Sequence, residues 1–491
     1  MHKLVFAGDA PAQTINSRVQ RGELRRLTRG VYTPDLTTPA SELIRREWLS
    51  VAGRAFPDAV ISDRSAPRGG PVDGLLYLVG SRRRELELPG LTIIARDGAP
   101  PLDDDIALPG GLYMASRARA LVENTFEARA RSGRPPRTLD DDELADWVNH
   151  LCAADGEARL TQYRRRADEI AAMLGAKPAT VARLSQLIGA ALGSQHVDTA
   201  SAALNARQYG RPFDTPAVHL FDLLVAALRS AAPQSRPAAE AGPEAFQVQA
   251  FFEAYFSNFI EGTTFEVDEA RQIVFDGQPI ATRPQDSHDI AGTFAVVADA
   301  PALAEPIGTA DEFIDVLRSW HRTLLGGRPE LEPGTFKRVA NRAGNTQFVA
   351  PALVDGTLRA GFERLAALDT AWERAVYTMF LVAEVHPFND GNGRIARVMM
   401  NAELVRGRQS KIIVPTGYRD GYLGALRRLT RDDDPTVLVR ALRYLHDYTS
   451  QIDWTSFDSA LGDLTSTNAF NDDEFGPRLR LLRSLNPADL T

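Results

Sequence analysis

Apolar residues recur along the chain at two spacings, and the change between them separates two kinds of secondary structure. Short apolar runs predict strands at 59–62, 75–79 and 91–95. Before them, apolar residues at helical spacing predict a helix over 41–56. From residue 141 onward they return every three to four positions, which is the period of a helix with one buried face. The helices predicted there cover 141–153, 157–174, 179–192, 216–230, 246–260, 311–325, 357–368, 370–385, 393–406, 419–430 and 434–448.

The helical pattern is interrupted by a segment without core-forming residues, which divides a multidomain, mainly α protein. Residues 231–243 (AAPQSRPAAEAGP) contain three prolines and five alanines, a composition typical of a linker. We therefore place the main domain boundary there. The other predicted parts are an N-terminal α+β region, 1–130, a helical region, 131–230, an all-α C-terminal domain, 244–450, and a polar tail, 451–491, which we expect to be weakly ordered.

Composition excludes several classes of protein. Of 491 residues, 44% are apolar and 24% are charged, values close to the average of globular proteins and far from those of disordered chains. The only cysteine, Cys152, excludes an intramolecular disulfide and a cysteine-rich zinc site. No apolar run approaches the roughly 18 residues that span a bilayer. We therefore expect a cytoplasmic protein without a membrane partner.

Basic residues gather near the N-terminus of an otherwise acidic chain. Residues 1–100 hold 15 lysines and arginines against 11 acidic residues, whereas the net charge of the whole chain is −8. Within 13–32, arginines accompany a single acid, Glu23, in a pattern that predicts a short helix, a turn and a strand, as in a winged helix. The arginines are Arg18, Arg21, Arg25, Arg26 and Arg29. Such a segment could contact DNA phosphates, dock a protein or simply be solvated, and the three interpretations stay open.

The stretch that carries chemistry is 386–397, with the sequence HPFNDGNGRIAR. The preceding apolar helix must end before Pro387, because proline disfavours helical backbone in the residue before it, so His386 lies at a helix end. The Gly- and Asn-rich loop that follows leads directly into the next apolar helix, where backbone N–H groups can bind an anion. Arg394 and Arg397 are three residues apart, so both can project from one helix face toward phosphate oxygens.

Two further side chains add groups that phosphoryl transfer requires. Asp390 offers a hard oxygen ligand of the kind that Mg²⁺ takes alongside substrate phosphates. His386 can remove a proton from an attacking hydroxyl group. Together with the anion site and the two arginines, they predict in-line transfer from a nucleoside triphosphate to an alcohol.

Every position of 386–397 resembles the Fic motif, HPFx[D/E]GNGRxxR. The resemblance extends over roughly residues 246–450 and implies a Fic-domain protein adenylyltransferase, which moves AMP from ATP to a Tyr, Thr or Ser hydroxyl of a target protein. By that resemblance His386 is the general base, Asp390 the magnesium ligand and Phe388 the anchor of the loop. The implied nucleotide-binding residues are Gly391, Asn392 and Gly393 as the anion hole, Arg394 for the leaving phosphates, Arg397 for the γ-phosphate, and Tyr422. The implied catalytic set is His386, Asp390, Asn392, Arg394 and Arg397.

A second motif ends the strongly apolar helix over 246–260. Ser257, Glu261 and Gly262 resemble the inhibitory [S/T]xxxE[G/N] motif of Fic proteins whose inhibitory helix lies N-terminal to the core. A glutamate paired with Arg397 occupies the guanidinium that should hold the γ-phosphate, so that ATP binds only unproductively. Ser257 could support the helix end, and Gly262 could equally be an ordinary C-cap. The resemblance to some Fic proteins also permits Glu261 to orient water for the reverse reaction, deAMPylation.

Less specific features resemble other parts of a Fic domain. Residues 336–350 (FKRVANRAGNTQFVA) resemble the β-hairpin flap that aligns a target by strand addition, although a plain surface hairpin has the same pattern. The flap residues predicted to dock the target are Thr346, Gln347, Phe348 and Val349. Arg419 and Tyr422 resemble residues of the helix that closes the nucleotide site.

Three N-terminal stretches, 23–32 (ELRRLTRGVY), 63–66 (DRSA) and 115–125 (ASRARALVENT), resemble the AbiEi-type antitoxins of abortive-infection systems. Members of that family combine a winged helix with a larger C-terminal part and repress their own promoters. The resemblance implies a place in a toxin–antitoxin system and DNA as a partner through residues 13–32. A protein partner at the same surface stays open.

The sequence as a whole predicts an autoinhibited protein AMP-transferase with an antitoxin-like N-terminal half. The expected substrates are ATP, with Mg²⁺ as cofactor, and a hydroxyl group of a target protein or of the chain itself, which could also form a homo-oligomer. Two alternatives stay open: another Fic chemistry, such as UMP transfer or deAMPylation, and a DNA-binding autoregulator whose Fic core senses nucleotide. Gly391 argues against the phosphotransferase variant of the family, because that variant is associated with a motif that contains a lysine at this position.

Overall fold

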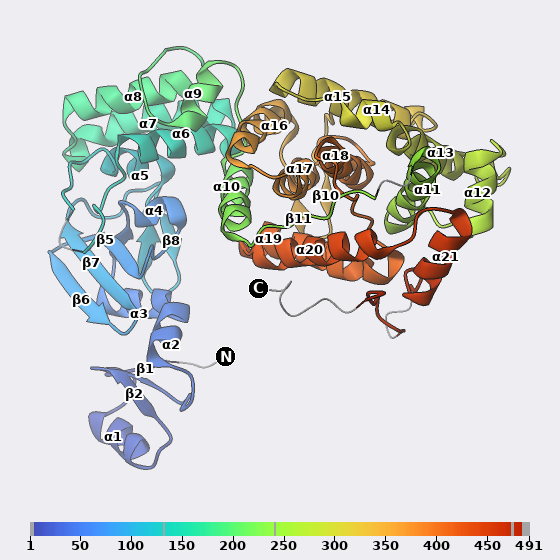
Figure 1. Cartoon of the computed structure of the whole chain (residues 1–491). Coiled ribbons are helices and arrows are strands. Elements are labelled where there is room, and N and C mark those ends of the chain that lie inside the picture. The colour runs from blue at the N-terminus through green and yellow to red at the C-terminus, as the bar shows by residue number, and fades with distance from the viewer. Residues whose placement is uncertain (1–3, 131–132, 240–241, 473–475, 484–491) are drawn as a thin grey trace. The chain divides into compact units, whose positions relative to one another are not determined.

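The structure is a computed structural model that describes residues 4–130, 133–239, 242–472 and 476–483. It divides into two compact units, Met1–Gly210 and Arg211–Thr491. The first unit combines β-sheets with helices, whereas the second is almost entirely helical (Figure 1). The chain is therefore mainly α and multidomain, as the apolar spacing predicts. In the described part of the chain, no helix is both long enough and apolar enough to cross a bilayer.

A small winged module begins the first unit. Helix α1 (Ala12–Gln20) is followed by two antiparallel strands, β2 (Arg25–Thr28) and β3 (Val31–Thr33). Strand β1 (Val5–Phe6) pairs with β3 and completes a sheet of order β1-β3-β2. The helix, turn and strand predicted within 13–32 are therefore present.

Several arginines of this winged module are engaged within the chain. Arg18 and Arg21 both approach Glu23, with N–O distances of 3.5 Å and 3.1 Å. The Arg25 guanidinium donates to two backbone oxygens in the loop after β3. These side chains are therefore less available than the arginine count suggests, and DNA contact through this segment stays a prediction.

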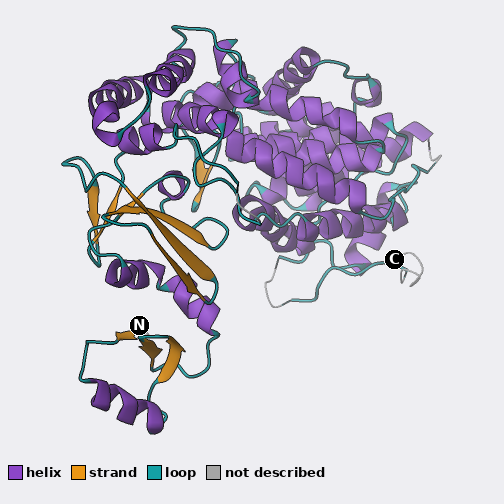
Figure 2. Ribbon diagram, turned by 90° about the vertical axis from the view of Figure 1, so that its left-hand side faces the viewer, coloured by secondary structure: helices purple, strands orange, loops and turns teal. Residues whose placement is uncertain are grey.

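A six-stranded mixed sheet forms the centre of the first unit (Figure 2). Its order is β6-β7-β5-β4-β9-β8, with parallel pairing between β5 and β7 and between β4 and β9. The strands are β4 (Val60–Ile61), β5 (Leu75–Gly80), β6 (Arg84–Leu88), β7 (Leu91–Asp97), β8 (Ile106–Leu108) and β9 (Leu112–Met114). Strand β5 is buried on both faces, so its sequence is a continuous apolar run, LLYLVG. The edge strand β6, RELEL, was not predicted because it contains only two apolar residues, although these alternate with charged ones.

Helices pack around this sheet in two groups with separate cores. Residues of α2 (Ala40–Arg46) and α3 (Trp48–Ala55) share one core with the sheet, so the single helix predicted over 41–56 is broken at Glu47. The second core joins residues of β4 and β5 to the helices that follow. The remaining helices are α4 (Ser65–Arg68), α5 (Arg117–Glu123), α6 (Asp141–Asp155), α7 (Glu157–Leu174), α8 (Pro178–Ala191) and α9 (Ala202–Gln208). A capping box between Asp140 and Glu143 fixes the start of α6.

Two buried helices form the centre of the second unit. Helices α17 (Ala371–Val385) and α18 (Asn392–Arg406) pack against each other, and the other helices surround them (Figure 1). The other helices are α10 (Thr215–Ser230), α11 (Gly242–Ile260), α12 (Val267–Phe275), α13 (Pro284–Val297), α14 (Ala300–Ala304), α15 (Ala310–Leu324), α16 (Val354–Glu363), α19 (Arg419–Asp432), α20 (Thr436–Gln451) and α21 (Phe457–Ser466). Short 3₁₀ helices are η1 (Pro329–Leu331), η2 (Pro351–Leu353), η3 (Arg364–Ala367) and η4 (Thr416–Tyr418), and the hairpin strands are β10 (Arg342–Ala343) and β11 (Thr346–Gln347). Most residues of α17 and α18 are buried, which explains their lack of a polar face.

The boundary between the units lies about twenty residues before the predicted linker, at Gly210 and Arg211. Helix α10 belongs to the second unit because its apolar face packs on α17, with Phe221 at ring-centroid distances of 6.1 Å from Tyr377 and 6.2 Å from Phe380. The described part of the predicted linker, up to residue 239, is also bound to this unit through backbone hydrogen bonds to residues 408 and 410. The segment rich in proline and alanine is therefore part of the second unit and does not separate two domains. Residues 240–241 lie outside the described residues.

The predicted polar tail, 451–491, is ordered structure for much of its length. Helix α21 forms there, and Phe457 lies 5.2 Å from Phe252 between ring centroids. Phe470 lies 5.1 Å from Phe256 in the same way. The expectation of weak order is wrong as far as Phe470, because widely spaced aromatic residues anchor a polar segment on α11. Residues 473–475 and 484–491 of the tail lie outside the described residues.

Candidate active site

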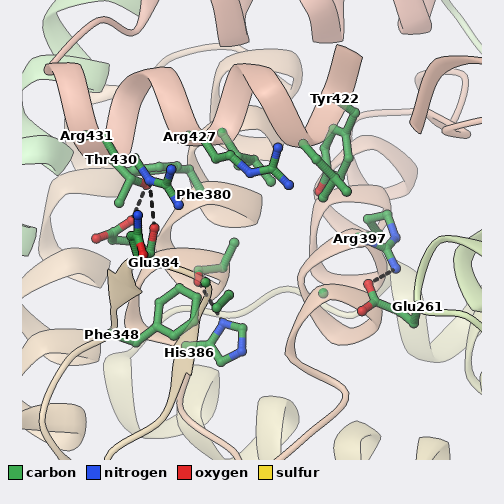
Figure 3. Close-up of a pocket in the computed structure, with 18 residues that line it drawn as sticks. Glu261, Phe348, Phe380, Glu384, His386, Arg397, Tyr422, Arg427, Thr430 and Arg431 are labelled. Carbon is green, nitrogen blue, oxygen red and sulfur yellow. Dashed lines mark hydrogen bonds and ion pairs between the residues drawn. The ribbon is translucent and has the colours of Figure 1, made fainter. Parts of the chain in front are cut away.

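A cavity of about 560 Å³ opens where α17 ends and α18 begins (Figure 3). Helices α17 and α19 and the hairpin β10–β11 supply its side walls. At one end lie Glu261 and, from α18, Gly393 and Arg397. Of the side chains predicted from sequence, those that line the cavity are Glu261, Thr346, Phe348, His386, Arg397 and Tyr422, together with Gly393. The cavity therefore brings the central motif, the inhibitory motif and the flap to one place.

The loop between α17 and α18 turns through two left-handed backbone positions. His386 caps α17 with φ 50°, and Gly391 caps the start of α18 with φ 73°. Asn392 closes the loop, because its Oδ1 accepts from the backbone N–H of Phe388 at 2.8 Å and its Nδ2 donates to the Phe388 oxygen at 2.9 Å. Phe388 itself is fully buried, in the position of a loop anchor. The side chain of Asn392 thus shapes the loop that was predicted to bind an anion.

His386 is held as a neutral imidazole with one nitrogen free. Its Nδ1 lies 3.2 Å from the backbone oxygen of Ala383, and a carbonyl can only accept, so Nδ1 carries the proton. Nε2 is then an acceptor. Burial lowers the pKa of His386 to about 4, and the ring stacks on Phe348 with centroids 3.7 Å apart. The geometry supplies a base that is unprotonated at neutral pH.

Three acceptors surround the guanidinium of Arg397. Nε donates to Ser257 Oγ at 3.0 Å, and a terminal nitrogen donates to the Ser257 backbone oxygen at 2.9 Å and to Glu261 Oε1 at 2.8 Å. Burial lowers the pKa of Arg397, but Glu261 and Tyr422 together more than offset this effect, and the net shift is upward. Ser257, expected only to support the helix end, is therefore a direct partner of the arginine. Gly262 adopts φ 92° after the last turn of α11, as a C-cap does.

The Glu261 carboxylate also lies at the N-terminus of α18. A Cβ atom added to Gly393, in the first turn of that helix, would overlap Glu261 Oε1. The N-terminus of a helix attracts anions through its free N–H groups and its dipole. Glu261 therefore occupies the position at which the sequence predicts a bound phosphate.

Arg394 lies behind the cavity wall. Its guanidinium donates to Asp289 Oδ2 at 2.8 Å and to Asn258 Oδ1 at 3.3 Å, and the residue is 2% exposed. Asp289 belongs to α13, a helix that the sequence did not predict, so this partner could not be foreseen. In this conformation Arg394 braces α18 against α13, and its predicted contact with leaving phosphates stays a prediction.

The Asp390 side chain is 51% exposed, and its Oδ2 lies 3.5 Å from a terminal nitrogen of Arg394. In the described part of the chain, no three potential ligand side chains of His, Cys, Asp or Glu gather into a metal site. A lone exposed carboxylate fits Mg²⁺ only in the mode where phosphates and water supply the other ligands.

The predicted flap is a short hairpin whose tip reaches the cavity. Strands β10 and β11 pair antiparallel, and Thr346 Oγ1 accepts from Arg431 Nε of α19 at 2.9 Å. Phe348 covers His386, while Gln347 is exposed. Val349, predicted among the docking residues, is instead buried in the core of the unit.

Two residues that the sequence did not single out fix the hairpin to the loop between α17 and α18. Asn341 donates from Nδ2 to the Phe388 oxygen at 2.9 Å, and it accepts from Lys337 Nζ at 2.6 Å. The Lys337 backbone N–H donates to the Pro387 oxygen at 2.8 Å. Burial lowers the pKa of Lys337 to about 8. A lysine and an asparagine in a predicted surface hairpin carry no signal of this role.

His321 of α15 supports the loop from the other side. Its Nδ1 accepts from the Gly334 N–H at 2.9 Å, so Nε2 carries the proton and donates to the Asp390 backbone oxygen at 2.9 Å. Its ring stacks on Phe388 with centroids 3.6 Å apart. The only sequence signal is a histidine on the apolar face of a helix, which more often marks a satisfied core residue.

Arg419 and Tyr422 of α19 lie near the C-terminal end of α11. Arg419 Nε donates to the Ile260 oxygen at 3.1 Å, at the end of α11. Tyr422 is 1% exposed, and the guanidinium carbon of Arg397 is 6.0 Å from its ring centroid. Tyr422 therefore borders the cavity beside Arg397, whereas Arg419 holds α11.

Residues 313–404 match the Fic/DOC family, and this segment contains the loop between α17 and α18. The chain carries a Fic domain. Protein adenylyltransferase fic-1 of Caenorhabditis elegans is 27% identical to it over 182 residues, which cover 36% of this chain and 36% of the relative. Protein adenylyltransferase Fic of Drosophila melanogaster is 28% identical over 210 residues, which cover 38% of this chain and 40% of the relative. The matched part of the Fic-containing chain thus spans little more than a third of these relatives.

Solved structures of Fic proteins give a weaker likeness. A fragment of Fic-1 from C. elegans is 20% identical, with a TM-score of 0.37, and the match covers 70% of this chain and 97% of that one. A Fic domain-containing signaling protein from Bacteroides thetaiotaomicron is 17% identical, with a TM-score of 0.37, over 53% of this chain and 100% of the other.

Proposed function

We propose that this protein is an autoinhibited protein AMP-transferase, which moves AMP from ATP to a Tyr, Thr or Ser hydroxyl of a target protein or of itself. The observation that carries the proposal is the neutral imidazole of His386, which faces the same cavity as Arg397 and the N-terminus of α18. The Fic domain and the relatives named protein adenylyltransferase support the same reaction.

The reaction follows from the groups in the cavity. ATP binds with its terminal phosphates against Arg397 and the start of α18, which leaves the α-phosphate nearer His386. The target hydroxyl oxygen attacks the α-phosphorus, its proton passes to His386 Nε2, and the bond from the α-phosphorus to the bridging oxygen of pyrophosphate breaks. The products are an AMP-modified protein and pyrophosphate. Bound phosphates raise the pKa of an adjacent imidazole, which strengthens His386 as a base when ATP is present.

Asp390 is the residue that would hold Mg²⁺. Its exposed carboxylate provides one ligand, and the other ligands come from phosphate oxygens and water. The ion, when bound, neutralises charge on the phosphates during transfer. His321 contributes by fixing the backbone of Asp390 through the hydrogen bond to its oxygen.

Inhibition follows from the contacts of Glu261. Its carboxylate accepts a hydrogen bond from Arg397 and fills the space over Gly393. The γ-phosphate is therefore repelled by a negative charge at the position where it would bind the arginine. ATP then binds, if at all, with its α-phosphate out of line with the attacking hydroxyl. Loss of Glu261 restores the anion site.

The test compares four purified full-length proteins incubated with α-³²P-labelled ATP and Mg²⁺. We expect little labelling of the unchanged protein, strong self-labelling or labelling of lysate proteins with Glu261→Gly, and none when Glu261→Gly is combined with His386→Ala. Asp276→Asn, an exposed acid at the end of α12, is the matched control and should behave like the unchanged protein. A Glu261→Gly protein that transfers nothing from ATP refutes the proposed function. Labelling by the double variant refutes the role of His386.

A further inference from the structure

The cavity contains a carboxyl group that none of these steps uses. Glu384 lies on the last turn of α17, two residues before His386, and is 8% exposed. Its Oε2 accepts from Thr430 Oγ1 of α19 at 2.7 Å. In the described part of the chain no second donor contacts this carboxyl group, and burial raises its pKa. A carboxyl oxygen that borders a cavity and has no protein donor can accept a hydrogen bond from a molecule bound there.

Glu384 and Arg397 mark opposite ends of the cavity (Figure 3). Between them the walls are largely apolar, because each helix turns one apolar face inward. On α17 this face is formed by two residues three positions apart, and α19 repeats the spacing. The apolar residues concerned are Phe380 and Ala383 of α17 and Leu423 and Leu426 of α19.

A nucleotide is likewise charged at one end, the phosphates, and mostly apolar at the other, the base. Its phosphates need the cationic end, at Arg397 and Gly393, and its flat base is mostly apolar on both faces. The base therefore occupies the apolar end, and only the polar atoms on its edge need partners there. Arg427 and Arg431 also line the cavity, but both are exposed, and Arg431 already donates to the flap. Glu384 is the buried polar group that a base edge would meet.

The geometry points to Glu384, oriented by Thr430, as the residue that selects the nucleobase: its free carboxylate oxygen accepts a hydrogen bond from the exocyclic amino group of adenine. This inference rests on the proposed function, since it assumes that the cavity binds a nucleoside triphosphate. A base with a carbonyl group at the same position would bring two acceptors together and leave both unpaired. Discrimination of this kind is stronger than discrimination by shape alone, because unpaired buried polar groups carry a large penalty.

Inosine triphosphate provides the sharpest probe, because it differs from ATP by a carbonyl group in place of the 6-amino group. In the Glu261→Gly protein we expect kcat/KM for self-modification to favour ATP over inosine triphosphate by about 10- to 100-fold. With Glu384→Gln added, the preference should fall to within about threefold, because the side-chain amide can rotate and donate to the carbonyl group. Asp432→Asn, an exposed acid two residues after Thr430, is the matched control and should leave the preference unchanged.

The outcomes separate this inference from the proposed function. An unchanged preference in the Glu384→Gln protein overturns the role of Glu384, while continued transfer from ATP leaves the proposed function intact. Transfer from neither nucleotide in the Glu261→Gly parent refutes the proposed function itself. If circular dichroism shows that Glu384→Gln does not fold, Thr430→Val takes its place, because it removes the donor that orients the carboxyl group. Thr430→Val should reduce the preference, and an unchanged value overturns the inference.

Discussion

The contacts of Arg397 predict that inhibition can be released in steps. Ser257→Ala removes the Oγ acceptor, 3.0 Å from Nε, and leaves the carboxylate in place. Glu261→Gln keeps the shape of the side chain and one acceptor oxygen but removes the charge. Glu261→Gly removes the charge and also clears the space over Gly393. We expect the transfer rate to rise in that order.

The magnitude follows from the burial of the two partners. Arg397 is 4% exposed, whereas the Glu261 side chain is 29% exposed, so the pair lies between a surface salt bridge and a buried one. Surface pairs contribute about 0–1 kcal/mol and hydrogen bonds to charged groups about 1.5–3 kcal/mol. We therefore expect Glu261→Gln to weaken the contact of residue 261 with Arg397 by about 1–2 kcal/mol. This change corresponds to an increase of roughly 5- to 30-fold in the rate of AMP transfer. Ser257→Ala should give about fivefold, and Glu261→Gly more than Glu261→Gln.

The assay is the initial rate of AMP incorporation, followed by the mass of the intact protein at fixed ATP and Mg²⁺. Circular dichroism melting of each variant serves as the control for folding. If Glu261→Gln transfers no faster than the unchanged protein while Glu261→Gly is active, charge is not the cause of inhibition and the electrostatic account is refuted. If Ser257→Ala matches Glu261→Gly, the ion pair is not the dominant contact.

Four further outcomes follow from other contacts. Because burial lowers the pKa of His386 to about 4, kcat/KM of the Glu261→Gly protein should stay level above about pH 5 and fall below it, and an acid limb near pH 6.5 would contradict this. His321→Ala should lower the free energy of unfolding by roughly 3 kcal/mol in urea titrations and slow transfer, since it removes two hydrogen bonds and a stacking contact. Phe470→Ala should cost roughly 2–3 kcal/mol in scanning calorimetry, and an unchanged melting temperature would show that the tail does not stabilise α11. Asp390→Asn should weaken the Mg²⁺ dependence of transfer, measured by Mg²⁺ titration, without changing the melting temperature.

The second unit is predictable where local sequence dictates structure. Apolar spacing locates α15, α17, α18 and α20 to within a few residues, and Pro387 and Gly391 locate the loop between the two central helices. Helices α12 and α13 were not predicted. A capping box between Glu266 and Glu269 starts α12, and a tertiary ion pair from Asp289 to Arg394 holds α13 in place. Propensity alone does not contain that information.

The candidate site divides in the same way. Residues proposed to act through their own chemistry, such as His386 and Arg397, are recognisable from residue type and spacing. Residues that act through a neighbour, such as His321 and Asn341, are not, because their partners lie 69 and 47 residues away in the sequence. Glu384 is a third case: a carboxyl group near the end of an apolar helix gives no sequence signal until α19 is seen to face it.

The position of α11 within the second unit limits how the proposed inhibition can be released. Phe251, Phe252 and Phe256 of this helix are fully buried, and Glu253 forms a buried ion pair with Lys411 at 2.8 Å. Withdrawing the whole helix would expose the centre of the unit and unfold it. An activator therefore has only the last turn to act on, from Ser257 to Gly262, and needs to rotate a single side chain. Inhibition of this kind should persist in any fragment that still folds, and should be tunable by ligands far smaller than a protein.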